Sequence, residues 1–208
     1  MSKETVLRFK KADAKLLEKK RVYDGFFKMD EYLLSHRLFA GGESEAFTRE
    51  VFERGDAVVV IPYDVARQQV VLIEQFRAGA LTRCETPWML EFVAGMFEEN
   101  ESATEVGARE CKEEANIDVK PIELKKVMTY LSSPGGMSET MHLYWADVDA
   151  SGVEGVHGLD EENEDILVHV VSIDDALRLL NEGKITNAST VIGLQWLALN
   201  YKTLSADK

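Results

Sequence analysis

The sequence has few cysteines and no long apolar run, and each shortage excludes a class of protein. Its 208 residues include two cysteines, Cys84 and Cys111, too few for a disulfide framework or a thiolate zinc site. The longest apolar stretch, about Ala57–Ile61, is far shorter than the ~20 residues of a membrane-spanning helix. The first residues, Met1–Thr5, lack the basic and then apolar layout of a signal peptide. We therefore expect a reduced, cytoplasmic protein without a membrane partner.

Basic residues are also scarce, and the acidic excess is unevenly distributed. The chain has 24 Lys and Arg against 37 Asp and Glu, a formal net charge of −13, which argues against nucleic acid as a partner. Eight acidic and two basic residues lie between Glu98 and Asp118, and Asp160–Asp165 adds five more acidic residues. Like charge packed this densely opposes folding unless cations bind. The charge pattern therefore favours a metal site.

The chain divides into two regions at about residue 55. Residues 1–55 are expected to form an N-terminal antiparallel β-sheet annex, and residues 56–208 a compact α/β domain. The annex strands are predicted at Leu16–Phe26, Lys28–Leu38 and Glu45–Glu53. In the larger domain the predicted strands are Ala57–Tyr63, Gln69–Phe76, Trp88–Ala94, Leu124–Leu131, Met141–Val148 and Ile166–Val171.

Three helices are expected in the larger domain. The first begins with the capping-box spacing of Ser102 and Glu105 and ends near Asn116, a residue that tolerates the left-handed conformation. The second follows Ser172 and runs to about residue 181. The third spans about residues 189–201, with an apolar stripe that we expect to be core: Val191, Leu194, Leu197 and Leu199.

The first of these helices carries carboxylates on one face. Glu110, Glu113 and Glu114 stand at i, i+3 and i+4, so they share a face and repel one another. Oxygen ligands grouped in this way suit Mg²⁺ or Mn²⁺, which bind carboxylates, water and phosphate oxygens. A solvated acidic face is the alternative reading of these three residues alone.

The wider spacing around that helix is more specific. Gly95, five residues, Glu101, seven residues, Arg109–Glu114, one residue and then Asn116–Ile117 resembles the Nudix box, GX5EX7REUXEEXGU. All charged positions match. Cys111 replaces the usual aliphatic residue, and Asn116 replaces the final glycine. The resemblance implies a Nudix α/β/α sandwich with a mixed sheet, and a metal-dependent hydrolase.

The likeness extends over essentially the whole chain to one branch of that family, the bacterial ADP-ribose pyrophosphatases. The segments that carry it include Tyr23–Phe27, Arg49–Gly55, Ile73–Arg77, Glu85–Trp88, Glu91–Met96, Ser133–Glu139 and Glu161–Asp165. This resemblance implies Mg²⁺-dependent cleavage of ADP-ribose to AMP and ribose 5-phosphate. It also implies a homodimer with exchanged N-terminal strands in the annex and active sites shared between subunits.

The resemblance assigns metal and catalytic roles to named residues. Metal would be bound by Glu110, Glu114, Glu164 and the backbone carbonyl of Ala94. Glu113 would assist, through contacts around the metal or as a further ligand. Glu162 would be the general base, with Glu161 beside it as the alternative.

The same resemblance implies two groups of substrate-binding residues. Six would contact the substrate: Arg49, Glu50, Arg54, Arg77, Met96 and Glu139. Five would complete the pocket, expected from the partner subunit: Phe26, Phe27, Ser133, Pro134 and Gly135. Phe26 and Phe27 could equally be dimer core. Arg109 is expected to orient ligands by pairing with Glu113 or with a backbone carbonyl, rather than to touch substrate.

Two rival functions remain open at this stage. The Nudix box binds the diphosphate that all nucleoside diphosphate sugars share, so GDP-mannose or ADP-glucose is an alternative substrate. A non-catalytic module that senses a nucleotide is the second alternative, but Glu101, Glu110, Glu113 and Glu114 are all present.

Overall fold

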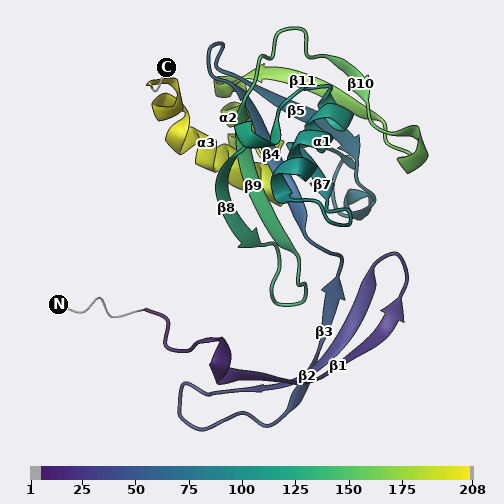
Figure 1. Ribbon diagram of the computed structural model, residues 1–208, viewed down its shortest axis with the longest axis vertical. Helices are drawn as coiled ribbons and strands as arrows, with labels where there is room; N and C mark the ends of the chain where they lie inside the picture. Colours follow the sequence, from purple (N-terminus) through teal and green to yellow (C-terminus); the bar gives the residue numbers. More distant parts are fainter. Residues whose placement is uncertain (1–5, 207–208) are drawn as a thin grey trace, which may run out of the picture. The chain divides into compact units, whose positions relative to one another are not determined.

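The structure, a computed structural model, describes residues 6–206 (Figure 1). The signal-peptide expectation drawn from Met1–Thr5 lies outside these residues. The chain forms two compact units, which we describe separately. The first comprises residues 1–55 and 131–139, and the second comprises residues 56–130 and 140–208. The segment 131–139, which sequence analysis assigned to the larger domain, thus joins the first unit.

The first unit contains an antiparallel sheet in the order β1-β2-β3. A 3-10 turn, η1 (Lys11–Asp13), leads into its strands β1 (Ala14–Asp24), β2 (Lys28–His36) and β3 (Phe47–Glu53). All eleven residues of β1 are exposed, although Leu16, Leu17, Val22 and Tyr23 are apolar or aromatic. Segment 131–139 reaches β3 through a parallel bridge between Phe52 and Met137.

The second unit is built on a mixed eight-stranded sheet with the order β10-β11-β5-β4-β9-β8, while β6 pairs with β5 and β7 with β4. Its strands β4 and β9 are parallel, whereas β4–β5, β5–β11 and β10–β11 are antiparallel. The strands are β4 (Ala57–Asp64), β5 (Gln69–Phe76), β6 (Trp88–Glu91), β7 (Val93–Met96), β8 (Lys125–Leu131), β9 (Thr140–Asp147), β10 (Gly155–His157) and β11 (Ile166–Ser172).

Helices cover both faces of this sheet because its central strands are apolar on both sides. Alternate β4 residues enter different cores: Val58 and Val60 pack with helix α1, and Val59 and Ile61 pack with α2 and α3. Figure 1 shows α1 on one side of the sheet and the other two helices on the opposite side. Their bounds are α1 (Ala103–Ala115), α2 (Ile173–Asn181) and α3 (Ala188–Ala206). The predicted α/β/α sandwich with a mixed sheet is confirmed.

Short 3-10 turns complete the unit: η2 (Ala78–Ala80), η3 (Pro121–Glu123) and η4 (Asp160–Glu162). Within residues 6–206, no helix has both the length and the apolar character needed to cross a bilayer.

The predicted single strand Trp88–Ala94 is wrong, because the chain bends at Phe92. The Phe92 N–H donates to the Thr190 hydroxyl on α3, at 3.0 Å, instead of to a strand. The segment therefore pairs first with β5 and then, beyond the bend, with β4. This bend places Glu91 on β6 and Ala94 on β7, a strand that contacts α1.

The predicted core stripe of α3 is partly wrong. Leu194 and Leu197 are fully buried, but Leu199 is 84% exposed. Residue 199 follows residue 194 by five positions, which on a helix of 3.6 residues per turn places it about 140° around the axis.

Candidate active site

Helix α1 begins and ends as its sequence predicts. The Ser102 hydroxyl accepts from the Glu105 N–H while the Glu105 carboxylate accepts from the Ser102 N–H, at 2.8 Å. Asn116 ends the helix in the left-handed conformation, with φ of 51°. Because Val106, Cys111 and Ala115 face the core, the glutamates of the box lie on an adjoining face.

Arg109 connects the carboxylates of the box. Its guanidinium donates to Glu101 at 3.1 Å, to Glu110 at 2.7 Å and to Glu113 at 3.0 Å. It also donates to the backbone carbonyl of Met96, at 3.2 Å. The prediction that Arg109 pairs with Glu113 or with a carbonyl is confirmed. Arg109 therefore orients three glutamates and the end of β7 together.

Glu110 and Glu114 are carboxylates in a low-dielectric environment. Burial raises the pKa of Glu110 to about 7, although Arg109 opposes the shift. Burial raises the pKa of Glu114 well above its usual value, and the charges of Glu110 and Glu164 add to that effect. Glu114 is 2% exposed and accepts from the Ala94 N–H at 2.9 Å. Burial therefore raises these two pKa values by more than the nearby Arg109 and Arg77 lower them.

The donor set fits a hard divalent cation. Among residues 6–206 no three acidic, His or Cys side chains stand in the geometry of a completed metal site. The residues nonetheless provide the buried carboxylate of Glu114, the half-buried carboxylate of Glu110 and, beside them, the backbone of β7. This is the oxygen chemistry that Mg²⁺ and Mn²⁺ prefer. A Cβ atom at Gly95 would overlap the Glu110 carboxylate, so only glycine leaves Glu110 in this place.

The acidic loop lies beside the same helix. Gly158 donates its N–H to the carbonyl of Glu113 at 3.2 Å, which ties the loop to α1. Glu162 closes η4 with an exposed side chain, and Asn163 follows in the left-handed conformation. The Glu164 carboxylate accepts from the Leu159 N–H, at 3.3 Å. The loop thus combines a half-buried Glu164 with an exposed Glu162.

Arg77 lies at the end of β5, within reach of the acidic cluster. It donates to Glu91 through Nε and Nη2, with the shortest distance 2.8 Å. Burial alone would lower the pKa of Arg77, but the bonds to Glu91, and then the charges of Glu91, Glu114 and Glu164, raise it. The structure therefore brings together the predicted residues Arg77, Glu114 and Glu164.

Three polar residues near Arg77 were missed by the sequence analysis. Glu91 is 2% exposed, and it accepts from the Asn187 amide at 3.0 Å. Gln75 is 5% exposed, and its amide nitrogen has no hydrogen-bond partner among the described residues. The sequence could have indicated Glu91 and Gln75, because each is a polar residue near the end of a largely apolar strand.

The first unit contains most of the predicted substrate-binding residues. Arg54 pairs with the buried Glu139 at 3.2 Å, and its guanidinium covers the Phe27 ring at 5.3 Å. Ser132 donates to the other oxygen of Glu139, at 2.7 Å. Phe27 also contacts the rings of Phe26 and Phe52. The structure thus brings Arg54, Glu139 and the aromatic pair together.

Other predicted residues of this unit lie at its surface. Ser133, Pro134 and Gly135 are exposed in the turn before β9, and Phe26 is 86% exposed. Arg49 and Glu50 are exposed on β3, where the Arg49 guanidinium covers the Phe47 ring.

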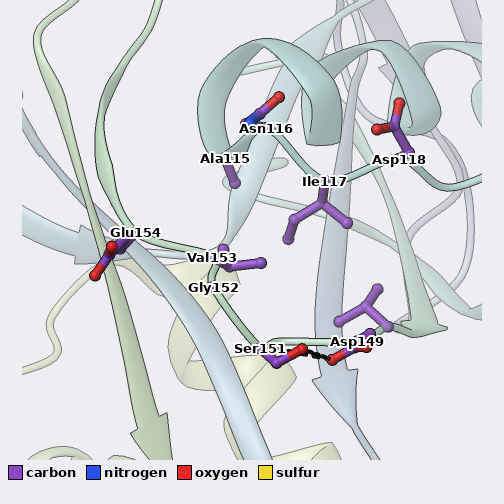
Figure 2. Close-up of a pocket in the computed structure, with 10 residues that line it drawn as sticks. Ala115, Asn116, Ile117, Asp118, Asp149, Ser151, Gly152, Val153 and Glu154 are labelled. Atoms are coloured by element: carbon purple, nitrogen blue, oxygen red, sulfur yellow. Dashed lines mark hydrogen bonds between the residues drawn. The ribbon is translucent and has the colours of Figure 1, made fainter.

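A cavity of about 350 Å³ lies at the C-terminal end of α1, and it coincides with none of these residues (Figure 2). Asn116, Asp118 and Asp149 are among its lining residues. Its acidic side chains have local partners: Asp118 pairs with Lys112, and Asp149 accepts from Ser151. The cavity is therefore separate from the candidate active site.

Comparison with known proteins identifies the fold and the box. The model of the NUDIX domain matches residues 44–191. The chain belongs to the Nudix family of hydrolases. The prediction made from the box is confirmed, and enzymes of this family are in general dependent on divalent metals.

Curated relatives within the Nudix family differ in how similar they are. The ADP-ribose pyrophosphatase of Escherichia coli strain K12 is 50% identical over 199 residues, covering 96% of this chain and 94% of that protein. The GDP-mannose pyrophosphatase of Pectobacterium atrosepticum is 31% identical, covering 86% and 91%. A crystal structure described as an ADP compounds hydrolase has a TM-score of 0.69 at 20% identity, covering 92% and 96%. The predicted likeness to ADP-ribose pyrophosphatases is confirmed.

Proposed function

We propose that this protein hydrolyses the diphosphate bond of ADP-ribose to AMP and ribose 5-phosphate with Mg²⁺. The observation that carries the proposal is the complete Nudix box, in which Arg109 joins the carboxylates of Glu101, Glu110 and Glu113. The substrate assignment rests on 50% identity to curated ADP-ribose pyrophosphatases over almost the whole chain.

Glu110, Glu114, Glu164 and the Ala94 carbonyl are the groups proposed to hold Mg²⁺, with Mn²⁺ as a possible substitute. The bound metal would neutralise the diphosphate and lower the pKa of a water molecule. Glu113 is bonded to Arg109, so it supports the site by keeping that guanidinium between Glu110 and Glu101.

Glu162 is the proposed general base. Its side chain is exposed and belongs to the turn that precedes Glu164, so one loop presents both a base and a metal ligand. A carboxylate on an accessible loop can act as a general base by accepting a proton from the attacking water. Glu161, its neighbour in η4, is the alternative base.

Substrate recognition is assigned to two sets of residues. Arg77 and Met96 belong to the unit that carries the Nudix box, and Arg77 has the planar fork that suits phosphate oxygens. Arg54 and Glu139 belong to the first unit, beside an aromatic surface on which an adenine could stack. The remaining proposed contacts are Arg49, Glu50, Phe26, Phe27, Ser133, Pro134 and Gly135.

A homodimer with shared active sites is part of the proposal. Strand β1 is exposed along its whole length and carries four large apolar or aromatic side chains, a surface that a second copy would cover. Light scattering on the purified protein would measure its mass directly. A monomer at all concentrations would remove the dimer from the proposal. The cytoplasmic location expected from its two cysteines is retained as a proposal.

Product analysis tests the function. Purified protein is incubated with ADP-ribose, with ADP-glucose and with GDP-mannose, each with Mg²⁺ and with a chelator. We expect AMP and ribose 5-phosphate, formed only with metal and fastest from ADP-ribose. Faster hydrolysis of GDP-mannose would keep the chemistry and replace the substrate. Inactivity on all three substrates would favour the nucleotide-sensing module.

A further inference from the structure

Glu91 is a buried carboxylate that none of the roles above uses. It ends β6 and is 2% exposed. Arg77 donates to Oε1 at 3.2 Å from Nε, and to Oε2 at 3.1 Å from Nε and 2.8 Å from Nη2. This side-on pairing occupies one edge of the guanidinium and holds its plane in a single orientation.

Asn187 holds Glu91 from the opposite side. Its Nδ2 donates to Glu91 Oε1 at 3.0 Å. Its own Oδ1 accepts from the Thr190 N–H at 3.2 Å and from the Ser189 hydroxyl at 2.6 Å, at the start of α3. Those donors require the amide oxygen to face the helix, so the amide nitrogen faces Glu91.

The remaining edge of Arg77 is available to a ligand. Nη1 makes none of the bonds to Glu91, and the Arg77 side chain is 41% exposed while Glu91 is 3% exposed. The carboxylates of Glu114 and Glu164 are near enough to act electrostatically on Arg77. Arg77 therefore lies within electrostatic range of two of the groups proposed to hold the metal and hence the diphosphate.

We propose that Glu91 and Asn187 are positioning residues, through which the start of α3 fixes the Arg77 guanidinium so that Nη1 meets a diphosphate oxygen. The inference rests on the proposed function and adds two residues to it. An arginine on a flexible side chain loses rotamer freedom when it binds an anion. Fixing that arginine in advance removes part of the loss, so the two residues lower the KM for substrate.

Asn187→Asp separates this role from helix capping. Aspartate is as good a capping residue as asparagine, so α3 keeps its start. The Asn187→Asp substitution removes the amide donor, however, and places a second carboxylate against Glu91. We expect KM for ADP-ribose to rise roughly tenfold or more, because a small displacement of a ligand-binding group is sufficient for such a loss. We expect the kcat to change less than the KM. The thermal midpoint should fall, because the two carboxylates repel each other and Glu91 is buried.

The second variant is Glu91→Gln, which keeps the shape of the side chain and removes its charge. Both variants are also made in an Arg77→Ala background. If Glu91 and Asn187 act through Arg77, neither substitution lowers kcat/KM further once Arg77 is absent. Asn200→Ala is the matched control, since Asn200 lies on the same helix and its amide donates only to the Trp196 carbonyl among the described residues.

The outcomes separate this inference from the proposed function. Equal losses in the wild-type and Arg77→Ala backgrounds would overturn the positioning role, as would an unchanged KM in both variants. A wild-type protein that does not hydrolyse ADP-ribose would instead overturn the proposed function. The same cycle would then be repeated with whichever nucleoside diphosphate sugar the protein cleaves.

Discussion

Asp30 in the first unit and Glu114 in the second are both almost fully buried, yet their surroundings shift their pKa values in opposite directions. Arg21 and then Lys19 bond to Asp30 and hold its pKa below the usual range. Burial raises the pKa of Glu114, which has a backbone N–H as its partner. Nearby bases thus outweigh burial at Asp30, whereas burial outweighs the nearby positive charge at Glu114. This difference supports our proposal that Glu114 binds a cation and that Asp30 stabilises the first unit.

Removing the proposed base gives the largest effect expected from a functional carboxylate. Glu162→Gln is expected to lower turnover by about 10²–10⁴-fold, because the attacking water loses its proton acceptor. Substrate binding and the thermal midpoint should stay near their wild-type values, since Glu162 is exposed. Steady-state kinetics measure turnover and substrate binding, and thermal unfolding measures the midpoint. Turnover that persists in Glu162→Gln but is lost in Glu161→Gln would move the base by one residue.

Replacing Glu114 tests whether this buried carboxylate binds the metal. We expect Glu114→Gln to raise the Mg²⁺ concentration for half-maximal activity at least about 10–100-fold, a loss known even for residues that only support metal ligands. Without metal, the variant should unfold at a higher temperature than the wild type, because a buried negative charge is gone. An unchanged Mg²⁺ activation curve would remove Glu114 from the ligand set.

Gly95→Ala tests the position of Glu110 without changing any charge. The new Cβ would overlap the Glu110 carboxylate and displace it. We expect a rise in the Mg²⁺ requirement of the order of tenfold, smaller than that of Glu114→Gln because the displaced carboxylate remains nearby. Gly79→Ala is the control, since its Cβ would meet no atom within 4 Å. Equal activation curves for the two variants would contradict the packing argument.

Asp30→Asn should affect stability rather than catalysis. The lowered pKa means that the ionised Asp30 stabilises the fold above its unfolded-state pKa of about 4, and that this contribution is lost as the pH falls through the folded-state value. The midpoint of the variant should therefore lie a few degrees below that of the wild type at pH 7, and the gap should narrow below about pH 4. Thermal unfolding at both pH values measures it.

Glu18→Gln is the control for that experiment, because Glu18 is an exposed carboxylate on the neighbouring strand. If the difference in thermal midpoint between Asp30→Asn and the wild type stays constant from pH 7 to pH 3, the charge of Asp30 is not its cause.

Leu199→Ala is expected to have the smallest effect, within about 0.5 kcal/mol of the wild-type free energy of unfolding, because the side chain is exposed. Leu197→Ala, two residues earlier and fully buried, should lose about 2–5 kcal/mol. Urea unfolding compares them. Equal losses of unfolding free energy in the two variants would show that Leu199 is part of the core.

The features that the sequence predicted correctly depend on patterns of residues close together in the chain. The capping residues Ser102 and Glu105, the left-handed Asn116 and the spacing of the glutamates all depend on residues within one or two turns of a helix. Alternation and apolar runs likewise identified most of the strands, but not the break at Phe92 or the short strand β10. Leu199 was assigned to the core because apolar character alone, without the helical angle, was used to extend the stripe.

The sequence by itself determined the family, the face of α1 that carries the carboxylates and most of the strands, because each depends on short-range spacing. Only the tertiary structure decided that Phe92 bends toward Thr190, that Arg77 meets Glu91, and that Asn187, 96 residues from Glu91, holds it in place. Such partners are chosen by the packing of distant segments. No local periodicity encodes which donor will lie beside a buried carboxylate.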